Sequence, residues 1–218
     1  MIRIVAVVLL LAGCTGSVAE LDDLQELYAQ GDYAAVAARP LECTLGEEGC
    51  ARSHEMKADS CLRLAQQAVR EARAAEAAEP ADCAAHNYRA LLAADLGDAT
   101  ALGARELEAV RLERESAPDF AAGGTFNDAL ARRASDFGAR EPSLAEGPYY
   151  AASALFWRAS FEDVTDDCAV LRDARDLAAR AAESPSAEGG PPGGVGEAAR
   201  ALARRATEAA RSRGCAGV

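Results

Sequence analysis

The sequence predicts an all-α fold made of antiparallel helical hairpins, stacked as a short solenoid or packed as an irregular bundle. Alanine is the most frequent residue, and alanine has the highest helix propensity. Valine, isoleucine and threonine, which favour strands, are scarce after residue 14. Glycine and proline gather between long segments that lack them, which is the pattern of helices joined by short turns.

Capping residues and breakers divide the chain into segments. Gly31-Asp32 and Gly97-Asp98 each indicate a helix end followed by the N-cap of the next helix. The Gly/Pro-rich stretch 184–196 predicts a flexible loop. The expected helices span residues 20–30, 33–38, 50–78, 83–96, 99–115, 125 or 127 to 137, 149–161, 168–183 and 197–213.

The first thirteen residues predict an export signal. Arg3 provides a positive charge, and the apolar run 4–11 that follows is too short to cross a membrane as a helix. Leu11-Ala12-Gly13-Cys14 then resembles the lipobox of bacterial lipoproteins. The alternative is an ordinary cleaved signal that happens to contain a cysteine.

The lipobox resemblance implies that Cys14 is lipidated and becomes the first residue of the mature chain. Residues 14–19 would then be a tether, and residues 20–218 would form one helical domain in the cell envelope. Thr15, rather than Asp, follows the cysteine, which by family analogy implies the outer membrane, facing the periplasm.

An internal similarity indicates repeats. The segments 27–38 and 93–104 align, and their Gly-Asp turns are about two 33–34-residue units apart. Residues 27–33 resemble the turn between the two helices of a tetratricopeptide repeat (TPR), in which Gly forms a left-handed corner and Tyr packs across it. Pro40 departs from the pattern by shortening the second helix. The resemblance implies a TPR-like domain.

Six cysteines remain after Cys14, and an even number in an exported chain points to disulfides. Folding 168–183 and 197–213 as a hairpin brings Cys168 close to Cys215. We pair Cys43 with Cys50 by proximity and Cys61 with Cys83 by elimination. Free or mixed thiols are the remaining alternative.

A zinc site is the minor alternative for four of these positions. Cys50 and His54, together with Cys83 and His86, could supply a Cys₂His₂ set from two helices. Exported cysteines usually oxidise, and the spacings fit no familiar zinc module. We therefore expect neither a metal nor any other cofactor.

The net charge of −12 argues against nucleic-acid binding, because such a surface repels phosphates. The chain contains no nucleophile elbow, zinc-protease motif or phosphate-binding glycine loop. We therefore expect no enzymatic activity.

Five of the aromatic residues fall within thirteen positions, which predicts either a buried central helix or the lining of a binding groove. These residues are Tyr149, Tyr150, Phe156, Trp157 and Phe161. Residues 148–152 with Trp157 also resemble a helix of TatT-type lipoproteins, the helical-repeat subunits associated with TRAP transporters.

The leading functional hypothesis is a membrane-anchored, non-enzymatic scaffold that binds a protein partner in the cell envelope. Helical repeats bind partners through extended faces, and the sequence offers few catalytic residues. The alternative is a TatT-like, small-ligand-binding component of a transporter.

Overall fold

The computed structural model describes residues 15–162, 166–187 and 190–215, with side chains from residue 21, and these residues are helical with no β-sheet. Residues 1–14, which carry the expected signal and Cys14, lie outside the described ranges. The helices are α1 (Thr15–Ala29), α2 (Tyr33–Ala38), α3 (Cys50–Arg70), the 3₁₀ helix η2 (Ala74–Ala77), α4 (Ala78–Ala93), α5 (Ala99–Glu115), α6 (Phe120–Arg140), α7 (Glu146–Phe161), α8 (Asp167–Glu183) and α9 (Val195–Ser212).

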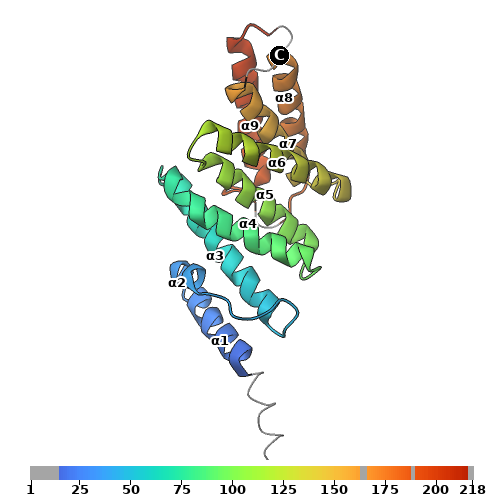
Figure 1. Ribbon diagram of the computed structural model, residues 1–218. Coiled ribbons are helices and arrows are strands. Elements are labelled where there is room, and N and C mark those ends of the chain that lie inside the picture. The colour runs from blue at the N-terminus through green and yellow to red at the C-terminus, as the bar shows by residue number, and fades with distance from the viewer. Residues whose placement is uncertain (1–14, 163–165, 188–189, 216–218) are drawn as a thin grey trace, which may run out of the picture.

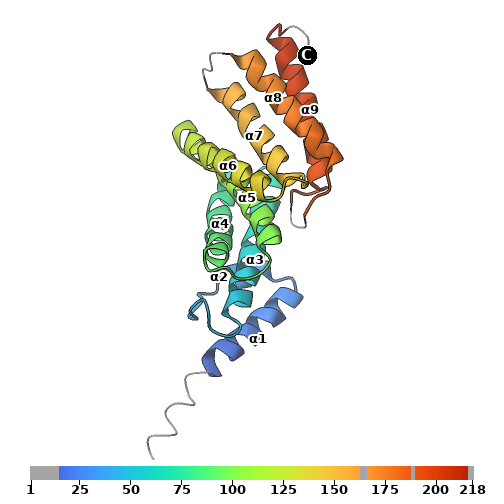
Figure 2. The same cartoon turned by 90° about the vertical axis from the view of Figure 1, so that its right-hand side faces the viewer.

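The helices stack along one direction (Figures 1 and 2). Each α-helix packs against the next, and α1, α3, α5 and α7 each also contact the next odd-numbered helix. The result is an elongated molecule with α1 and α2 at one end and α8 and α9 at the other (Figure 2). The expected all-α fold of stacked hairpins is confirmed. Within the ranges listed above, no helix has the length and apolar character needed to span a bilayer.

Local capping signals set several helix ends where the sequence predicts them. The helices expected at 33–38 and 99–115 are confirmed as α2 and α5. Side-chain oxygens of Asp32, Asp98 and Asp166 accept backbone N–H groups at the starts of α2, α5 and α8, at distances of 2.9–3.1 Å. These bonds satisfy donors that have no partner within the helix.

The single helix expected at 50–78 is wrong, because the chain turns near residue 72. Ala72 takes the left-handed conformation, with φ of 58°, and the Arg73 N–H donates to the Ala68 carbonyl (2.8 Å). Pro80, expected to end a helix, is the third residue of α4. Proline fits there because N–H groups in the first turn have no partner within the helix.

Helices α1 and α6 begin at least five residues earlier than expected, and α7 and α9 begin slightly earlier, at Glu146 and Val195. Asp119 caps α6 by accepting the Ala122 N–H (2.9 Å), so this helix starts at Phe120 rather than at residue 125 or 127. Helix α1 starts at Thr15, so residues 15–19 are helical where we expected a tether.

The two Gly-Asp turns have the expected backbone but do not occupy equivalent places in a repeat. Gly31 and Gly97 both have positive φ, of 77° and 83°. Gly31 lies between an odd and an even helix, α1 and α2, whereas Gly97 lies between an even and an odd helix, α4 and α5. Three α-helices separate the two turns, so the interpretation of two equal repeat units is wrong.

Helix α5 lies at the centre of the stack, and it buries charged side chains as well as apolar ones. The Glu108 carboxylate has no solvent exposure. It accepts hydrogen bonds from Arg111 (2.7 and 2.8 Å), from the Tyr150 hydroxyl of α7 (3.0 Å) and from Gln66 of α3 (3.3 Å). One carboxylate therefore joins three successive odd-numbered helices.

A second buried contact joins α5 to α6 and α7. The Arg114 guanidinium donates to the Asn127 side chain (3.0 Å) and to the Ser153 hydroxyl (3.0 Å), and all three residues are buried. Asn127 in turn donates to the Ala154 carbonyl (3.2 Å). These bonds fix the positions of α6 and α7 relative to α5.

Glu113 on α5 makes stability depend on pH. Burial raises the pKa of its carboxyl to about 7, and the carboxylates of Asp82 and Glu106 add to this increase, whereas Arg89 and Arg133 oppose it. Because the folded-state pKa exceeds the unfolded value, the stabilisation is complete below about pH 4.5 and is lost as pH rises through 7.

We expect Glu113→Gln to reduce this pH dependence. Between pH 4.5 and 8, the free energy of unfolding of the wild type should fall by up to about 3 kcal/mol more than that of the variant. Urea unfolding at a series of pH values measures the difference. Parallel pH profiles for the two proteins would show that Glu113 keeps an ordinary pKa.

Candidate functional site

The five aromatic candidates on α7 separate into a buried group and an exposed group. Tyr149 and Tyr150 are buried in the main core, and the Tyr150 hydroxyl donates to Glu108. Phe156 is half-buried, beneath the Arg205 guanidinium. The expectation that the tyrosines line a binding groove is therefore wrong: in this structure they pack in the core.

An exposed aromatic cluster, formed by Phe120, Trp157 and Phe161, lies where α6 begins and α7 ends. The Phe120 and Trp157 rings stack nearly parallel, with centroids 5.0 Å apart. Phe161 contacts both rings, at 5.4 Å from Trp157 and 6.1 Å from Phe120. Phe120 and Phe161 are 50% and 61% exposed, and they are the only exposed large apolar side chains in the described ranges.

Two glycines of α6 let Trp157 lie against the helix backbone. A Cβ atom at Gly123 would stand 3.2 Å from the indole Cζ2 atom, and one at Gly124 would stand 3.8 Å from Cη2. Glycine inside a helix costs about 1 kcal/mol relative to alanine. At Gly123 the absence of a side chain allows the indole to approach closely. The Trp157 ring is therefore held against the backbone of α6.

Phe120 lies outside the helix that the sequence predicts from residue 125 or 127. The local signal that could have found it is Asp119, an N-cap residue directly after Pro118. That signal places Phe120 at the first helical position. Its proximity to Trp157 depends on how α6 packs against α7, which has no local sequence signature.

All three expected disulfides form: Cys43–Cys50, Cys61–Cys83 and Cys168–Cys215. The first closes the loop before α3, and the second joins α3 to α4. The third joins the start of α8 to the segment after α9, as expected for an antiparallel hairpin.

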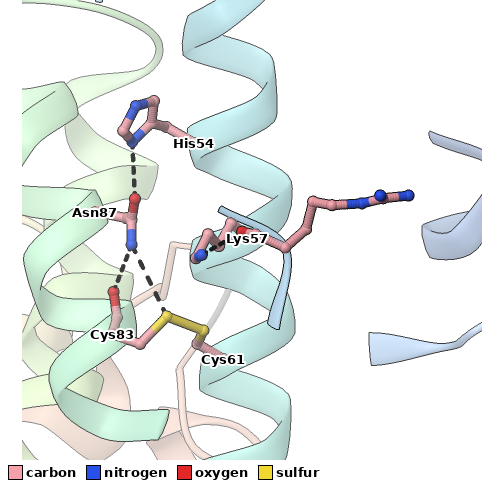
Figure 3. The surroundings of a disulfide bond; sticks show 6 residues. His54, Lys57, Cys61, Cys83 and Asn87 are labelled. Atoms are coloured by element: carbon pink, nitrogen blue, oxygen red, sulfur yellow. Dashed lines mark hydrogen bonds between the residues drawn. A yellow bond between two sulfur atoms is a disulfide. The ribbon is translucent and has the colours of Figure 1, made fainter. Parts of the chain in front are cut away.

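The zinc alternative at Cys50, His54, Cys83 and His86 is wrong in this structure. The two cysteines belong to different disulfides, and a sulfur bonded to sulfur is not a thiolate ligand. The His54 Nδ1 atom instead lies 2.7 Å from the Asn87 side-chain oxygen. Figure 3 shows this contact beside the Cys61–Cys83 disulfide. Asn87 in turn donates to the Cys83 carbonyl (2.8 Å), and His86 is exposed. A compact group formed by Cys43, Cys50 and His54 contains the first disulfide, so its sulfurs are not thiolates either.

We expect the Cys168–Cys215 bond to stabilise the fold more than the Cys43–Cys50 bond. Their sequence separations are 47 and 7 residues, so the chain-entropy model gives losses of about 4 and about 2 kcal/mol when each pair becomes serine. Urea unfolding of the two double variants measures both losses. Equal losses, or a larger loss for Cys43/Cys50, would contradict this order.

Comparisons of the chain with models of known protein families, with curated proteins and with solved structures found no match. The helix stack, its disulfides and the exposed aromatic cluster are therefore the observations from which a function is inferred.

Proposed function

We propose that this chain is a lipid-anchored scaffold of the bacterial cell envelope, and that it binds a protein partner through the aromatic cluster. The anchor is supported by Leu11-Ala12-Gly13-Cys14, which resembles a lipobox, and Thr15 favours the outer membrane with the domain in the periplasm. The three disulfides are consistent with export, because such bonds persist in oxidising compartments such as the periplasm.

The observation that carries the binding proposal is the exposure of Phe120 and Phe161 beside Trp157, which packs against the backbone of α6. Large aromatic side chains dominate the energetics of protein interfaces, and Trp is enriched among the residues that contribute most. Phe120 and Phe161 expose about half or more of their surface beside Trp157. Because the three rings already pack against one another, binding a partner would cost little side-chain entropy in this protein.

The charge of the chain indicates the chemistry of the partner. The net charge of −12 and the exposed Asp119 at the edge of the aromatic cluster favour a partner with basic residues around an apolar side chain. Arg158, also nearby, forms an ion pair with Glu162 (3.3 Å), which reduces its effect on such a partner. Opposite charges would steer the two proteins together, and the apolar contact would retain them.

The helix stack gives partial support to a TPR-like scaffold. The contacts between successive odd-numbered helices are those of a solenoid, an architecture that offers extended binding faces. The Tyr28 and Tyr33 rings pack across the first Gly-Asp turn, with centroids 5.5 Å apart, as the repeat resemblance implies. The short helix α2 and the unequal positions of the two Gly-Asp turns count against regular repeats.

The alternative, a TatT-like subunit that binds a small ligand next to Trp157, has less support. Trp157 lies between Phe120 and Phe161 at the surface, whereas a cavity between α4, α5 and α6 is lined by other residues. No observation of the aromatic cluster favours a small molecule over a protein.

Photo-crosslinking tests the protein-binding proposal. A benzoyl-phenylalanine at position 120 or 161 should crosslink one envelope protein, and the same residue at the exposed position Arg172 on α8 should not. The purified partner should then bind the Phe120→Ser/Phe161→Ser variant about 30-fold more weakly than the wild type, the size typical of an interface hot spot.

The controls separate this proposal from other occupants of the same surface. Arg172→Ser should bind the partner with unchanged affinity, and circular dichroism should show equal helix content in all variants. Crosslinks only between copies of this chain, or equal partner affinity for the wild type and the double serine variant, would overturn the proposal. Vesicle binding that requires the aromatic cluster, without any protein partner, would overturn it as well.

A further inference from the structure

A cavity of about 530 Å³ lies between α4, α5 and α6, away from the aromatic cluster. Helices α4 and α6 both pack against α5, so α5 forms the floor and the other two form the walls. The volume falls in the range of about 300–1,000 Å³ that is typical of small-molecule sites. The lining combines charged side chains with apolar ones. The charged groups determine which ligand charge can bind, and the apolar groups determine which ligand surface can pack against them.

Arginines outnumber carboxylates in this lining, although the whole chain is strongly acidic. Glu106 on the floor is only 6% exposed, and it pairs with Arg89 of α4 (3.4 Å) and with Arg133 of α6. Glu106 is thus shared by two guanidinium groups, both of which also interact with Glu113. Arg140 adds a third guanidinium, and Asp136 is the second carboxylate of the lining.

Of the three arginines that line the cavity, Arg140 is the least engaged with other protein groups. It is exposed, and in the described ranges it has no carboxylate within 4 Å, whereas Arg89 and Arg133 already pair with Glu106. A guanidinium at the edge of a partly apolar cavity is suited to a planar anion, which it binds through two parallel hydrogen bonds.

Apolar side chains from all three helices also line the cavity, and a glycine of α5 lets one of them pack closely. Leu92 of α4, Leu107 of α5 and Phe137 of α6 line the cavity. A Cβ atom at Gly103 would lie 3.1 Å from two carbons of the Phe137 ring and 3.9 Å from an Arg140 nitrogen. Glycine at this position of α5 therefore lets the Phe137 ring pack against the helix backbone, at the expense of helix propensity.

We propose that this cavity binds a small organic carboxylate with an apolar chain. The carboxylate would be bound by Arg140 with Arg133, and the chain would lie against Leu92 and Ala93, which are the more accessible apolar residues of α4 in the lining. The volume fits one small molecule, and the apolar residues of the lining favour a ligand with a hydrocarbon part over an inorganic anion. This site is separate from the aromatic cluster, so the proposal does not depend on the proposed function.

Calorimetric titration of the purified full-length chain with octanoate tests this proposal. We expect one molecule of octanoate to bind per chain, and Arg140→Gln to weaken the binding about tenfold or more, as loss of a charged hydrogen bond implies. Gly103→Ala should weaken it too, because the added Cβ would press on the Phe137 ring and stand 3.9 Å from the Arg140 guanidinium. The matched control is Arg132→Gln, an exposed neighbour on α6 that does not line the cavity, and it should leave the affinity unchanged.

Three further probes separate the contributions of charge and apolar chain. Octan-1-ol lacks the charge, while acetate and inorganic phosphate lack the chain, so each should bind at least about tenfold more weakly than octanoate. Circular dichroism checks that every variant remains folded. Equal affinity for octanol or phosphate, equal effects of Arg140→Gln and Arg132→Gln, or no binding of octanoate at millimolar concentration would overturn the proposal.

Discussion

The buried Glu108 carboxylate is the contact on which the helix stack most depends. The helices are rich in alanine, and each buried alanine contributes little apolar area, so many arrangements of the hairpins would have similar hydrophobic energy. A buried carboxylate is different, because it is strongly unfavourable unless it is paired and hydrogen-bonded. Arg111 lies on the same helix, whereas Gln66 and Tyr150 come from α3 and α7. The full set of hydrogen bonds therefore forms only when α3, α5 and α7 pack together.

The polar contacts of α5 also position the surfaces to which we assign function. Arg114 bonds to Asn127 on α6 and to Ser153 on α7, and these two helices carry Phe120 and Trp157. The aromatic cluster is therefore arranged by a buried network and not by its own contacts alone. Glu106, also on α5, pairs with arginines on α4 and α6, so the same helix forms the floor of the cavity.

Features that depend on neighbouring residues in the sequence could be predicted. Asp98 after Gly97 marks the start of α5, because both the cap and the turn are local. The Cys168–Cys215 disulfide followed from two helices joined by a Gly/Pro-rich loop, since a hairpin brings its outer ends together. The other two pairings required only proximity and elimination.

Features that depend on tertiary partners could not be predicted. The left-handed turn at Ala72 has no glycine to signal it, and the hydrogen bond from Arg73 stabilises it only once α3 has formed. Tyr150 and Trp157 are about two helical turns apart and so share one face of α7. Tyr150 is nevertheless buried, whereas Trp157 lies in the aromatic cluster. What differs along this helix is the neighbour, since Tyr150 meets Glu108 and Trp157 meets Phe120.

The central claim is that the Glu108 network determines the stability of the stack, and the free energy of unfolding of Glu108→Gln tests it most directly. Removing one member of a buried charge pair while its partner remains should lower this free energy by about 3 kcal/mol. Asp176→Asn is the matched control, because Asp176 pairs with Arg175 at the surface and should change the free energy by no more than about 0.5 kcal/mol. If Glu108→Gln were no more destabilising than Asp176→Asn, the buried network would not be what stabilises this fold.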